Sequence, residues 1–338
     1  MPVVHASSMI GYDMDTKQIL YSDNIHEIRP VASISKIMTA ILACESGKLD
    51  DTVIIGDEIN KAYGSGIYIR IGEEMTLRDL VYGLMLRSGN DAAFSIAKYV
   101  GGSVDNFVLM MNNKAKELGM NDSTYNNPNG LDDKGGNLSS TYDMAILTSY
   151  AMKNDEYKKI TSTKKHTVKT NMNYYSWTNK NKLLFSYKYT TGGKTGFTKI
   201  AKRTLVTTAS NKNMNIVIVT LNDGNDFSNH KNLYERLFKE YTGYDILKKG
   251  DISIANLKDK NRYYILEGYK YDLKDIDKDN VKIKFDLRKE ENNNIGKVNV
   301  YLYDKKMFTT DVYIDKEKKV TFWQKIRGIF NKMYIGNL

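Results

Sequence analysis

The pattern of apolar and polar positions divides the chain into strands and helices. Residues 8–13 and 18–21 form two short runs that favour strands joined by a turn. Residues 204–209 and 214–221 predict a second pair of strands, separated by a polar turn. Because strands at both ends of this region enclose mostly helical sequence, we expect one antiparallel sheet with a helical insertion, an α+β fold.

Helix signals fill the sequence between these strands. Apolar spacing predicts a helix over residues 32–45. Thr76, with Asp79 as its partner, has the capping-box pattern of a helix start. Ser103 is expected to cap a further helix that ends near Gly119.

Beyond a last helix, predicted over residues 229–241, the pattern changes near Gly243. Short alternating apolar runs, such as Val281, Ile283 and Phe285, are separated by Asp, Lys and Asn clusters. Such runs are typical of a small all-β domain. We therefore expect a main domain over residues 1–243, a β domain over 244–320 and a separate terminal segment over 321–338.

The terminal segment has the pattern of an amphipathic helix. Its apolar residues follow one helical stripe, and they are Phe322, Ile326, Ile329, Phe330 and Met333. Its basic residues, with two just upstream, are Lys318, Lys319, Lys325, Arg327 and Lys332. We expect this segment to anchor the protein to an anionic membrane surface, because it is too short and too charged to span a bilayer. The alternative is a helix packed on the β domain.

Composition narrows the classes of partner. The chain has 338 residues and a net charge of +10, yet it carries no nucleic-acid motif. The charge fits attraction to anionic surfaces such as membranes or cell-wall polymers, or simply a Lys- and Asn-rich solvated surface. The single cysteine, Cys44, excludes an intramolecular disulfide and a cysteine metal cluster.

The N-terminus carries a weak targeting signal. Val4-His5-Ala6 resembles the end of a secretory signal peptide, although the charged and apolar regions that should precede it are absent. Either the match is accidental or most of the signal peptide is missing. We expect a location outside the cytoplasm, on the outer face of the cytoplasmic membrane.

The candidate nucleophile is Ser33, with Lys36 three residues later. One helical turn brings the two side chains to the same face, where a partly desolvated amine can take the serine proton. This spacing alone is not specific. It recurs in three places where we expect ordinary surface pairs, namely Ser95/Lys98, Ser162/Lys165 and Ser228/Lys231.

Two further elements distinguish Ser33 from the other three serines. Ser88-Gly89-Asn90 and then Lys194-Thr195-Gly196 follow it in the chain. Ser22-Asp23-Asn24 has a similar composition but precedes the nucleophile, so a turn explains it. Ser88 and Asn90 can complete a hydrogen-bonded network around Ser33 and Lys36.

The third element is suited to binding an anionic substrate group. Lys194 supplies positive charge, which would lower the pKa of Lys36 and attract a carboxylate. Thr195 and Thr198 offer hydroxyls to that carboxylate. Gly196, with Gly192 and Gly193, would let the strand backbone approach the ligand. The N–H groups of Ser33 and Phe197 would form an oxyanion hole.

Together these elements resemble one enzyme family. The resemblance rests on residues 30–39 (PVASISKIMT), 82–93 (YGLMLRSGNDAA), 127–131 (NPNGL) and 192–198 (GGKTGFT). The chain is similar to low-molecular-mass penicillin-binding proteins of the D-alanyl-D-alanine carboxypeptidase family over its first 240 or so residues. That resemblance implies a penicillin-binding/β-lactamase-like fold, acylation of the serine by peptidoglycan peptides ending in D-Ala-D-Ala, and inactivation by β-lactams. It implies no metal and no organic cofactor.

Two positions depart from the family pattern. Many relatives carry histidine where this chain has Asn129, so the role of that position is open. The usual Ala-Gly pair after the third element is Ala201-Lys202 here, which is expected to alter the edge of the pocket.

Three rival functions remain as alternatives, and a fourth, a Ser-His-Asp hydrolase, is disfavoured. A β-lactamase would need a carboxylate-held water, and no convincing Glu-x-x-x-Asn element lies between the second and third elements. A D,D-endopeptidase of the same superfamily is less favoured, because of the extra β domain and tail. A non-catalytic binding module is disfavoured by the joint presence of all the candidate groups. A Ser-His-Asp hydrolase lacks its nucleophile elbow, and the histidines are expected at the surface: His5, His26, His166 and His230.

Overall fold

The computed structural model describes residues 6–132, 135–254, 257 and 261–315. The chain divides into two compact units between Thr242 and Gly243. The helix predicted over residues 321–338 lies outside the described residues and stays a prediction. Within the described residues, no helix is long and apolar enough to cross a bilayer.

A five-stranded antiparallel sheet, in the order β2-β1-β11-β10-β9, is the centre of the first unit. The N-terminal strand pairs with β11, with Ser8 opposite Leu221, so segments far apart in the chain close one sheet. The α+β prediction is therefore confirmed. The strands are β1 (Ser8–Asp13), β2 (Ile19–Asp23), β9 (Thr190–Thr198), β10 (Lys202–Asn211) and β11 (Met214–Leu221).

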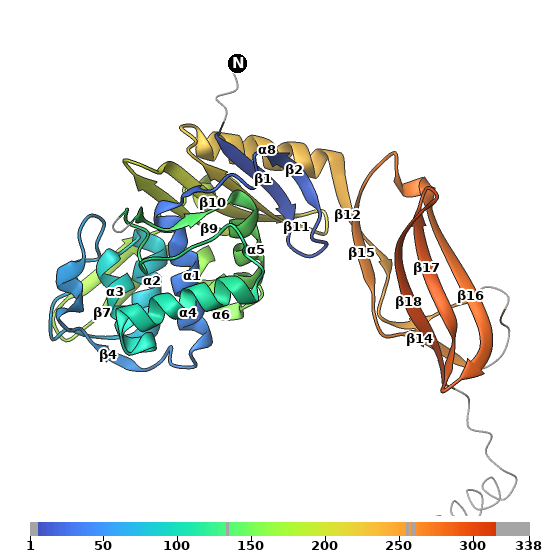
Figure 1. Ribbon diagram of the computed structural model, residues 1–338, viewed down its shortest axis with the longest axis horizontal. Helices are drawn as coiled ribbons and strands as arrows, with labels where there is room; N and C mark the ends of the chain where they lie inside the picture. The colour runs from blue at the N-terminus through green and yellow to red at the C-terminus, as the bar shows by residue number, and fades with distance from the viewer. Residues whose placement is uncertain (1–5, 133–134, 255–256, 258–260, 316–338) are drawn as a thin grey trace, which may run out of the picture. The chain divides into compact units, whose positions relative to one another are not determined.

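Helices cover both faces of this sheet (Figure 1). Successive residues of a strand point to opposite faces, so alternate residues of β11 contribute to two different cores. Ile216 and Ile218 pack with α8 (Asp226–Glu240). Val217 and Val219 pack in the larger core with the helical insertion.

The helical insertion follows the predicted start signals. The Thr76 hydroxyl accepts the Asp79 N–H at 3.0 Å, and the Ser103 hydroxyl accepts the Asn106 N–H at 3.1 Å, so both predicted caps are present. The insertion contains α1 (Lys36–Glu45), α2 (Leu77–Arg87), α3 (Asn90–Gly101), α4 (Val104–Glu117), α5 (Thr141–Ala151), α6 (Asp155–Ser162) and the short α7 (Leu183–Ser186). Smaller elements are η1 (Ala32–Ser35), η2 (Asp57–Lys61), β3 (Arg29–Pro30), β4 (Thr52–Ile54), β5 (Glu74–Thr76), β6 (Leu138–Ser139), β7 (Lys165–Lys169) and β8 (Tyr174–Thr178).

Three expectations from the sequence are wrong in detail. The single helix predicted over residues 32–45 is a 3-10 turn, η1, followed by α1. Ser95 is not at the surface: it is 1% exposed and donates to Glu58 Oε1 at 3.0 Å. His230 is also fully buried, and its two ring nitrogens are satisfied by the hydroxyls of Thr207 and Thr220, at 2.7 Å and 3.0 Å.

The second unit is all β, as predicted. Its five-stranded sheet has the order β13-β14-β18-β17-β16, and β12 pairs with β15 in a separate ribbon. Alternate residues Val298 and Val300 are buried against Val312 and Ile314, which is the period-two pattern of a half-buried sheet. The elements are β12 (Tyr241–Leu247), β13 (Gly250–Ile252), β14 (Arg262–Ile265), β15 (Tyr269–Lys274), η4 (Lys278–Asn280), β16 (Val281–Glu291), β17 (Asn294–Leu302) and β18 (Lys305–Asp315).

Candidate active site

Ser33 lies within η1, just before the start of α1 at Lys36. Ala32, just before it, has a left-handed backbone with φ of 52°, a conformation that a residue with a Cβ adopts only when its surroundings impose it. The Ser35 hydroxyl donates to the Ala32 carbonyl at 2.7 Å, and the Thr204 hydroxyl donates to the Val31 carbonyl at 2.9 Å. The turn carrying Ser33 is therefore tied both to itself and to strand β10.

Lys36 lies directly beneath Ser33 and is fully buried. Its Nζ donates to Ser33 Oγ at 3.0 Å, to Asn90 Oδ1 at 2.7 Å, and to the carbonyl of Asn129. No carboxylate receives a hydrogen bond from this amine in the described structure. The amine is thus surrounded by neutral acceptors, which do not compensate a full positive charge.

Burial is the main reason why the pKa of Lys36 falls to about 7. The positive charge of Lys180 lowers this pKa further, whereas Asp91 raises it. A large share of Lys36 is therefore neutral near physiological pH. A neutral amine 3.0 Å from a serine hydroxyl can accept its proton.

The second element forms a tight turn between two helices. Ser88 ends α2 in a left-handed conformation with φ of 66°, and Asn90 begins α3. This turn points Asn90 Oδ1 at Lys36, while Asn90 Nδ2 donates to the Tyr63 carbonyl at 2.5 Å. Asn90 is thus fixed from both sides, and its amide orientation follows from its partners.

Lys194, on β9, is 1% exposed and joins the site through Ser88. Its Nζ donates to Ser88 Oγ at 3.0 Å and to the Thr195 carbonyl at 2.7 Å. Burial, then the charges of Lys36 and Lys180, hold the pKa of Lys194 well below its usual range. The sequence-based prediction had Lys194 lowering the pKa of Lys36, but burial and Lys180 are the stronger causes.

Strand β9 passes close to the nucleophile at Gly196. A Cβ at Gly196 would lie 2.3 Å from Thr204 Oγ1 and 3.0 Å from the Ser33 nitrogen, so a side chain there would push the strand away. Thr195 and Gly196 are half-buried, and the Phe197 side chain is largely exposed. The expected binding strand therefore lies beside Ser33. Gly192 has a different role, because it packs against Thr161 inside the protein.

Thr198 is engaged by the protein itself. Its hydroxyl donates to Asp132 Oδ1 at 3.2 Å and accepts the Ala201 N–H at 2.9 Å. A substrate carboxylate that binds Thr198 must therefore replace the contact with Asp132. The other residues predicted for catalysis and binding lie together around Ser33 and Lys36.

Sequence reasoning missed the contribution of the segment from Asn127 to Gly130. The Asn129 carbonyl, not its side chain, reaches Lys36, while Asn129 Oδ1 accepts the Leu131 N–H at 3.0 Å. Asn127 Oδ1 accepts the Gly130 N–H at 2.6 Å, and Thr39 donates to the Pro128 carbonyl at 2.7 Å. The NPNGL run was a visible signal for this loop, but a carbonyl contact has no signature of its own.

Sequence reasoning assigned no role to Lys180, and it left the role of Arg203 open. Lys180 follows β8, and its backbone N–H donates to the Leu86 carbonyl at 3.1 Å, close to Ser88 in the chain. Arg203, after the unusual Lys202, forms a two-point ion pair with the buried Asp226, with distances of 2.6 Å and 3.1 Å. Asp226 therefore fixes the position of Arg203, opposite Phe197 in the pairing of β10 with β9.

Comparison with known proteins matches this site to one family. A family model described as D-alanyl-D-alanine carboxypeptidase matches residues 1–225, which include every element of the site. The chain belongs to the D-alanyl-D-alanine carboxypeptidase family. The activity, the serine-enzyme class and the β-lactam binding predicted from the sequence elements are confirmed as properties of this family.

Among its relatives, the D-alanyl-D-alanine carboxypeptidase DacF of Bacillus subtilis (strain 168) is 33% identical over 264 residues, or 75% of this chain and 67% of DacF. A D-alanyl-D-alanine endopeptidase of Escherichia coli (strain K12) is 28% identical over 225 residues, or 64% of this chain and 72% of the endopeptidase. The solved structure of penicillin binding protein 5 from Haemophilus influenzae covers 94% of this carboxypeptidase-family chain and 98% of its own, with a TM-score of 0.78 and 26% identity.

Proposed function

We propose that Ser33 carries the acyl group in this carboxypeptidase and that Lys36 is its base. The observation that carries the proposal is the 3.0 Å contact between Lys36 Nζ and Ser33 Oγ. It is supported by the complete burial of Lys36 and by its pKa of about 7. A protonated lysine could not accept the proton, so the lowered pKa is necessary for this role.

Acylation then follows from the arrangement of these groups. Neutral Lys36 takes the Ser33 proton as Oγ attacks the carbonyl carbon of the penultimate D-Ala. The N–H groups of Ser33 and Phe197 stabilise the oxyanion. When the tetrahedral intermediate collapses, the C–N bond breaks, and the proton held by Lys36 passes to the leaving amine of the terminal D-Ala. Ser88, whose hydroxyl lies 3.0 Å from Lys194 Nζ, is placed to relay it.

We assign recognition of the terminal carboxylate to the strand from Lys194 to Thr198. Lys194, Thr195 and Thr198 offer an amine and two hydroxyls along one strand edge. A bound carboxylate also favours the charged form of Lys194 and offsets its depressed pKa. In the second half of the reaction water attacks the ester, Lys36 accepts the water proton, and the Ser33 hydroxyl is regenerated.

The test is a covalent label with a matched control serine. Incubation with penicillin, followed by peptide mass spectrometry, should place the adduct on Ser33, and Ser33→Ala should lose both the adduct and D-Ala release from a disaccharide pentapeptide. Ser228→Ala removes the serine of a Ser-x-x-Lys pair away from the site and should leave both intact. An adduct on Ser228, Ser95 or Ser162 would refute the assignment.

The endopeptidase alternative has its own test. A carboxypeptidase that reads the terminal carboxylate should lose most of its kcat/KM when that carboxylate is amidated. Equal turnover of the acid and the amide would favour the endopeptidase activity named for one relative. Slow release of penicillin from Ser33 should distinguish the protein from a β-lactamase, which releases it rapidly.

We further propose that the protein acts on the outer face of the cytoplasmic membrane and that residues 321–338 bind anionic lipid. The support is the apolar stripe of this segment together with its basic residues. Truncation before residue 321 should abolish binding to phosphatidylglycerol vesicles and leave penicillin acylation unchanged. Unchanged vesicle binding, or loss of folding on truncation, would support a helix packed on the β domain.

A further inference from the structure

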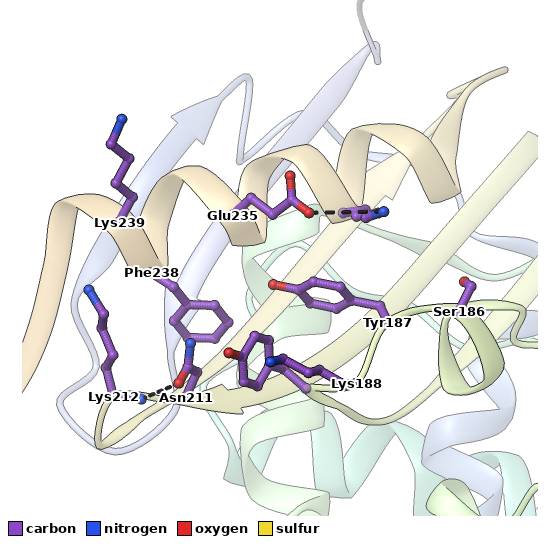
Figure 2. A pocket seen from close by; sticks show the side chains of 10 residues that line it. Ser186, Tyr187, Lys188, Asn211, Lys212, Glu235, Phe238 and Lys239 are labelled. Atoms are coloured by element: carbon purple, nitrogen blue, oxygen red, sulfur yellow. Dashed lines mark hydrogen bonds and ion pairs between the residues drawn. The ribbon is translucent and has the colours of Figure 1, made fainter.

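A hollow lies on the first unit, away from Ser33. It has a volume of about 600 Å³ and is formed by the segment before β9, the turn between β10 and β11, and α8 (Figure 2). Thr190 begins β9 beside this hollow, and Phe197 lies near the end of the strand that passes Ser33. These two positions are about 20 Å apart along an extended strand. The hollow is therefore separate from the catalytic site.

Lysines from three elements surround the hollow. Four of them line it, against a single glutamate, Glu235. Lys231 lies 3.9 Å from Glu235 and partly neutralises it. For Lys188, Lys212 and Lys239, no described carboxylate lies within ion-pair distance, and Lys188 Nζ lies 4.8 Å from the centre of the Tyr189 ring. The hollow therefore has excess positive charge.

Tyr187 places a hydrogen-bond donor in this hollow. The residue is 8% exposed, and its hydroxyl, which makes no hydrogen bond with any described residue, is open to solvent or to a ligand. Figure 2 shows the Tyr187 ring extending into the middle of the hollow, with the hydroxyl directed away from its own backbone. Burial, with a contribution from Glu235, raises the pKa of Tyr187 to about 12, so the group remains a hydrogen-bond donor at neutral pH.

The floor of the hollow is rigid. The Tyr187 ring stacks on Tyr234 at 5.8 Å, and Tyr234 stacks on Phe238 at 5.9 Å. Tyr234 and Phe238 are buried in the core between the sheet and α8. A donor fixed by such a stack loses little conformational entropy on binding, which is a property of preformed ligand sites.

We propose that this hollow binds a phosphate diester of an anionic polymer, one in which such diesters link polyol or sugar units. A diester keeps its negative charge throughout the physiological pH range and offers oxygens to both ammonium and hydroxyl donors. The hollow is far larger than one phosphate ion, so it accommodates the units on either side of the diester. Such a contact would hold this cell-wall enzyme near an anionic matrix without occupying its catalytic site.

The experiment uses the full chain and a synthetic glycerol phosphate hexamer, with binding measured by calorimetry at low salt. Tyr187→Phe removes only the hydroxyl and should weaken binding about tenfold, as expected for one hydrogen bond to a charged group. Lys212→Gln combined with Lys239→Gln should also weaken binding about tenfold, through the loss of two charge contacts. Higher salt should weaken the wild-type complex.

The control removes the same charge elsewhere. Lys48→Gln combined with Lys116→Gln lies on exposed positions of the helical insertion and should change the affinity less than about twofold, since only non-local charge is lost. Penicillin acylation should be unchanged in every variant, which shows that each is folded and separates this test from that of Ser33. Equal weakening in the control, binding of hexaglutamate as tight as that of the hexamer, or equally tight binding of inorganic phosphate would overturn the proposal.

Discussion

The protonation of Lys36 should set the pH dependence of acylation. Lys36 is fully buried, and its Nζ donates to Ser33, to Asn90 and to the Asn129 carbonyl, none of which carries a negative charge. Burial lowers its pKa from 10.5 to about 7, and Lys180 adds to this shift. Only the neutral amine can accept the Ser33 proton, so the acylation rate should rise with pH.

The size of the effect follows from that pKa. With a pKa of about 7, roughly one tenth of Lys36 is neutral at pH 6 and roughly nine tenths at pH 8. The second-order rate constant for acylation should therefore rise about tenfold between these two values and level off above pH 8. An ordinary exposed lysine would still be charged at pH 8, and the rate would keep rising beyond pH 9.

The assay is the rate of covalent labelling by a fluorescent penicillin, measured from pH 5.5 to 9.5 at constant ionic strength. Lys180→Gln removes the neighbouring positive charge, so the pKa of Lys36 and the midpoint of the profile should move to higher pH. Lys180→Arg keeps the charge and serves as the matched control, with its midpoint close to that of the wild type.

A flat profile between pH 6 and 8 would show that Lys36 is not the titrating base. Displacement of the midpoint by Lys180→Arg as large as that caused by Lys180→Gln would show that packing, and not charge, sets the pKa of Lys36.

Three further substitutions test the catalytic site and the helix cap of α2. Lys36→Met should abolish acylation and raise the melting temperature. The pKa of Lys36 is about 7 in the folded protein and about 10.5 in the unfolded chain, so proton binding favours the unfolded state, and methionine removes this cost. The buried amine costs up to about 5 kcal/mol at pH 7, and three lost hydrogen bonds of about 1 kcal/mol each offset part of this gain. Gly196→Ala places a Cβ 2.3 Å from Thr204 Oγ1 and should slow acylation about 100-fold by moving β9, and a normal labelling rate would contradict the fit at Ser33. Thr76→Ala removes the α2 cap and should cost about 1 kcal/mol of unfolding free energy in a denaturant titration, whereas any loss of acylation would link that cap to the site.

Local chemistry was enough to identify much of this protein from its sequence. Thr76 and Ser103 mark helix starts because a short hydroxyl side chain satisfies a free N–H in the first turn, and that contact depends only on neighbouring residues. Ser33 and Lys36 meet because one turn separates them. The order of this pair, Ser88-Gly89-Asn90 and Lys194-Thr195-Gly196 along the chain was enough to indicate the enzyme family.

The tertiary structure alone decided the hydrogen-bond partners and the pKa values of these groups. The Asn129 carbonyl reaches Lys36 because a loop folds back over α1, and a backbone carbonyl is present in every residue, so no sequence pattern marks it. Lys180 acts through space on two buried amines, one of which, that of Lys36, lies far from it in the chain. The Thr198 hydroxyl, at the end of β9, donates to Asp132, which lies 66 residues earlier in the chain. Burial and electrostatic potential depend on everything that surrounds a group in three dimensions. The sequence therefore predicted which residues meet at the site and that Lys36 acts as the base, but not the complete burial and the Lys180 charge that lower the pKa values of Lys36 and Lys194.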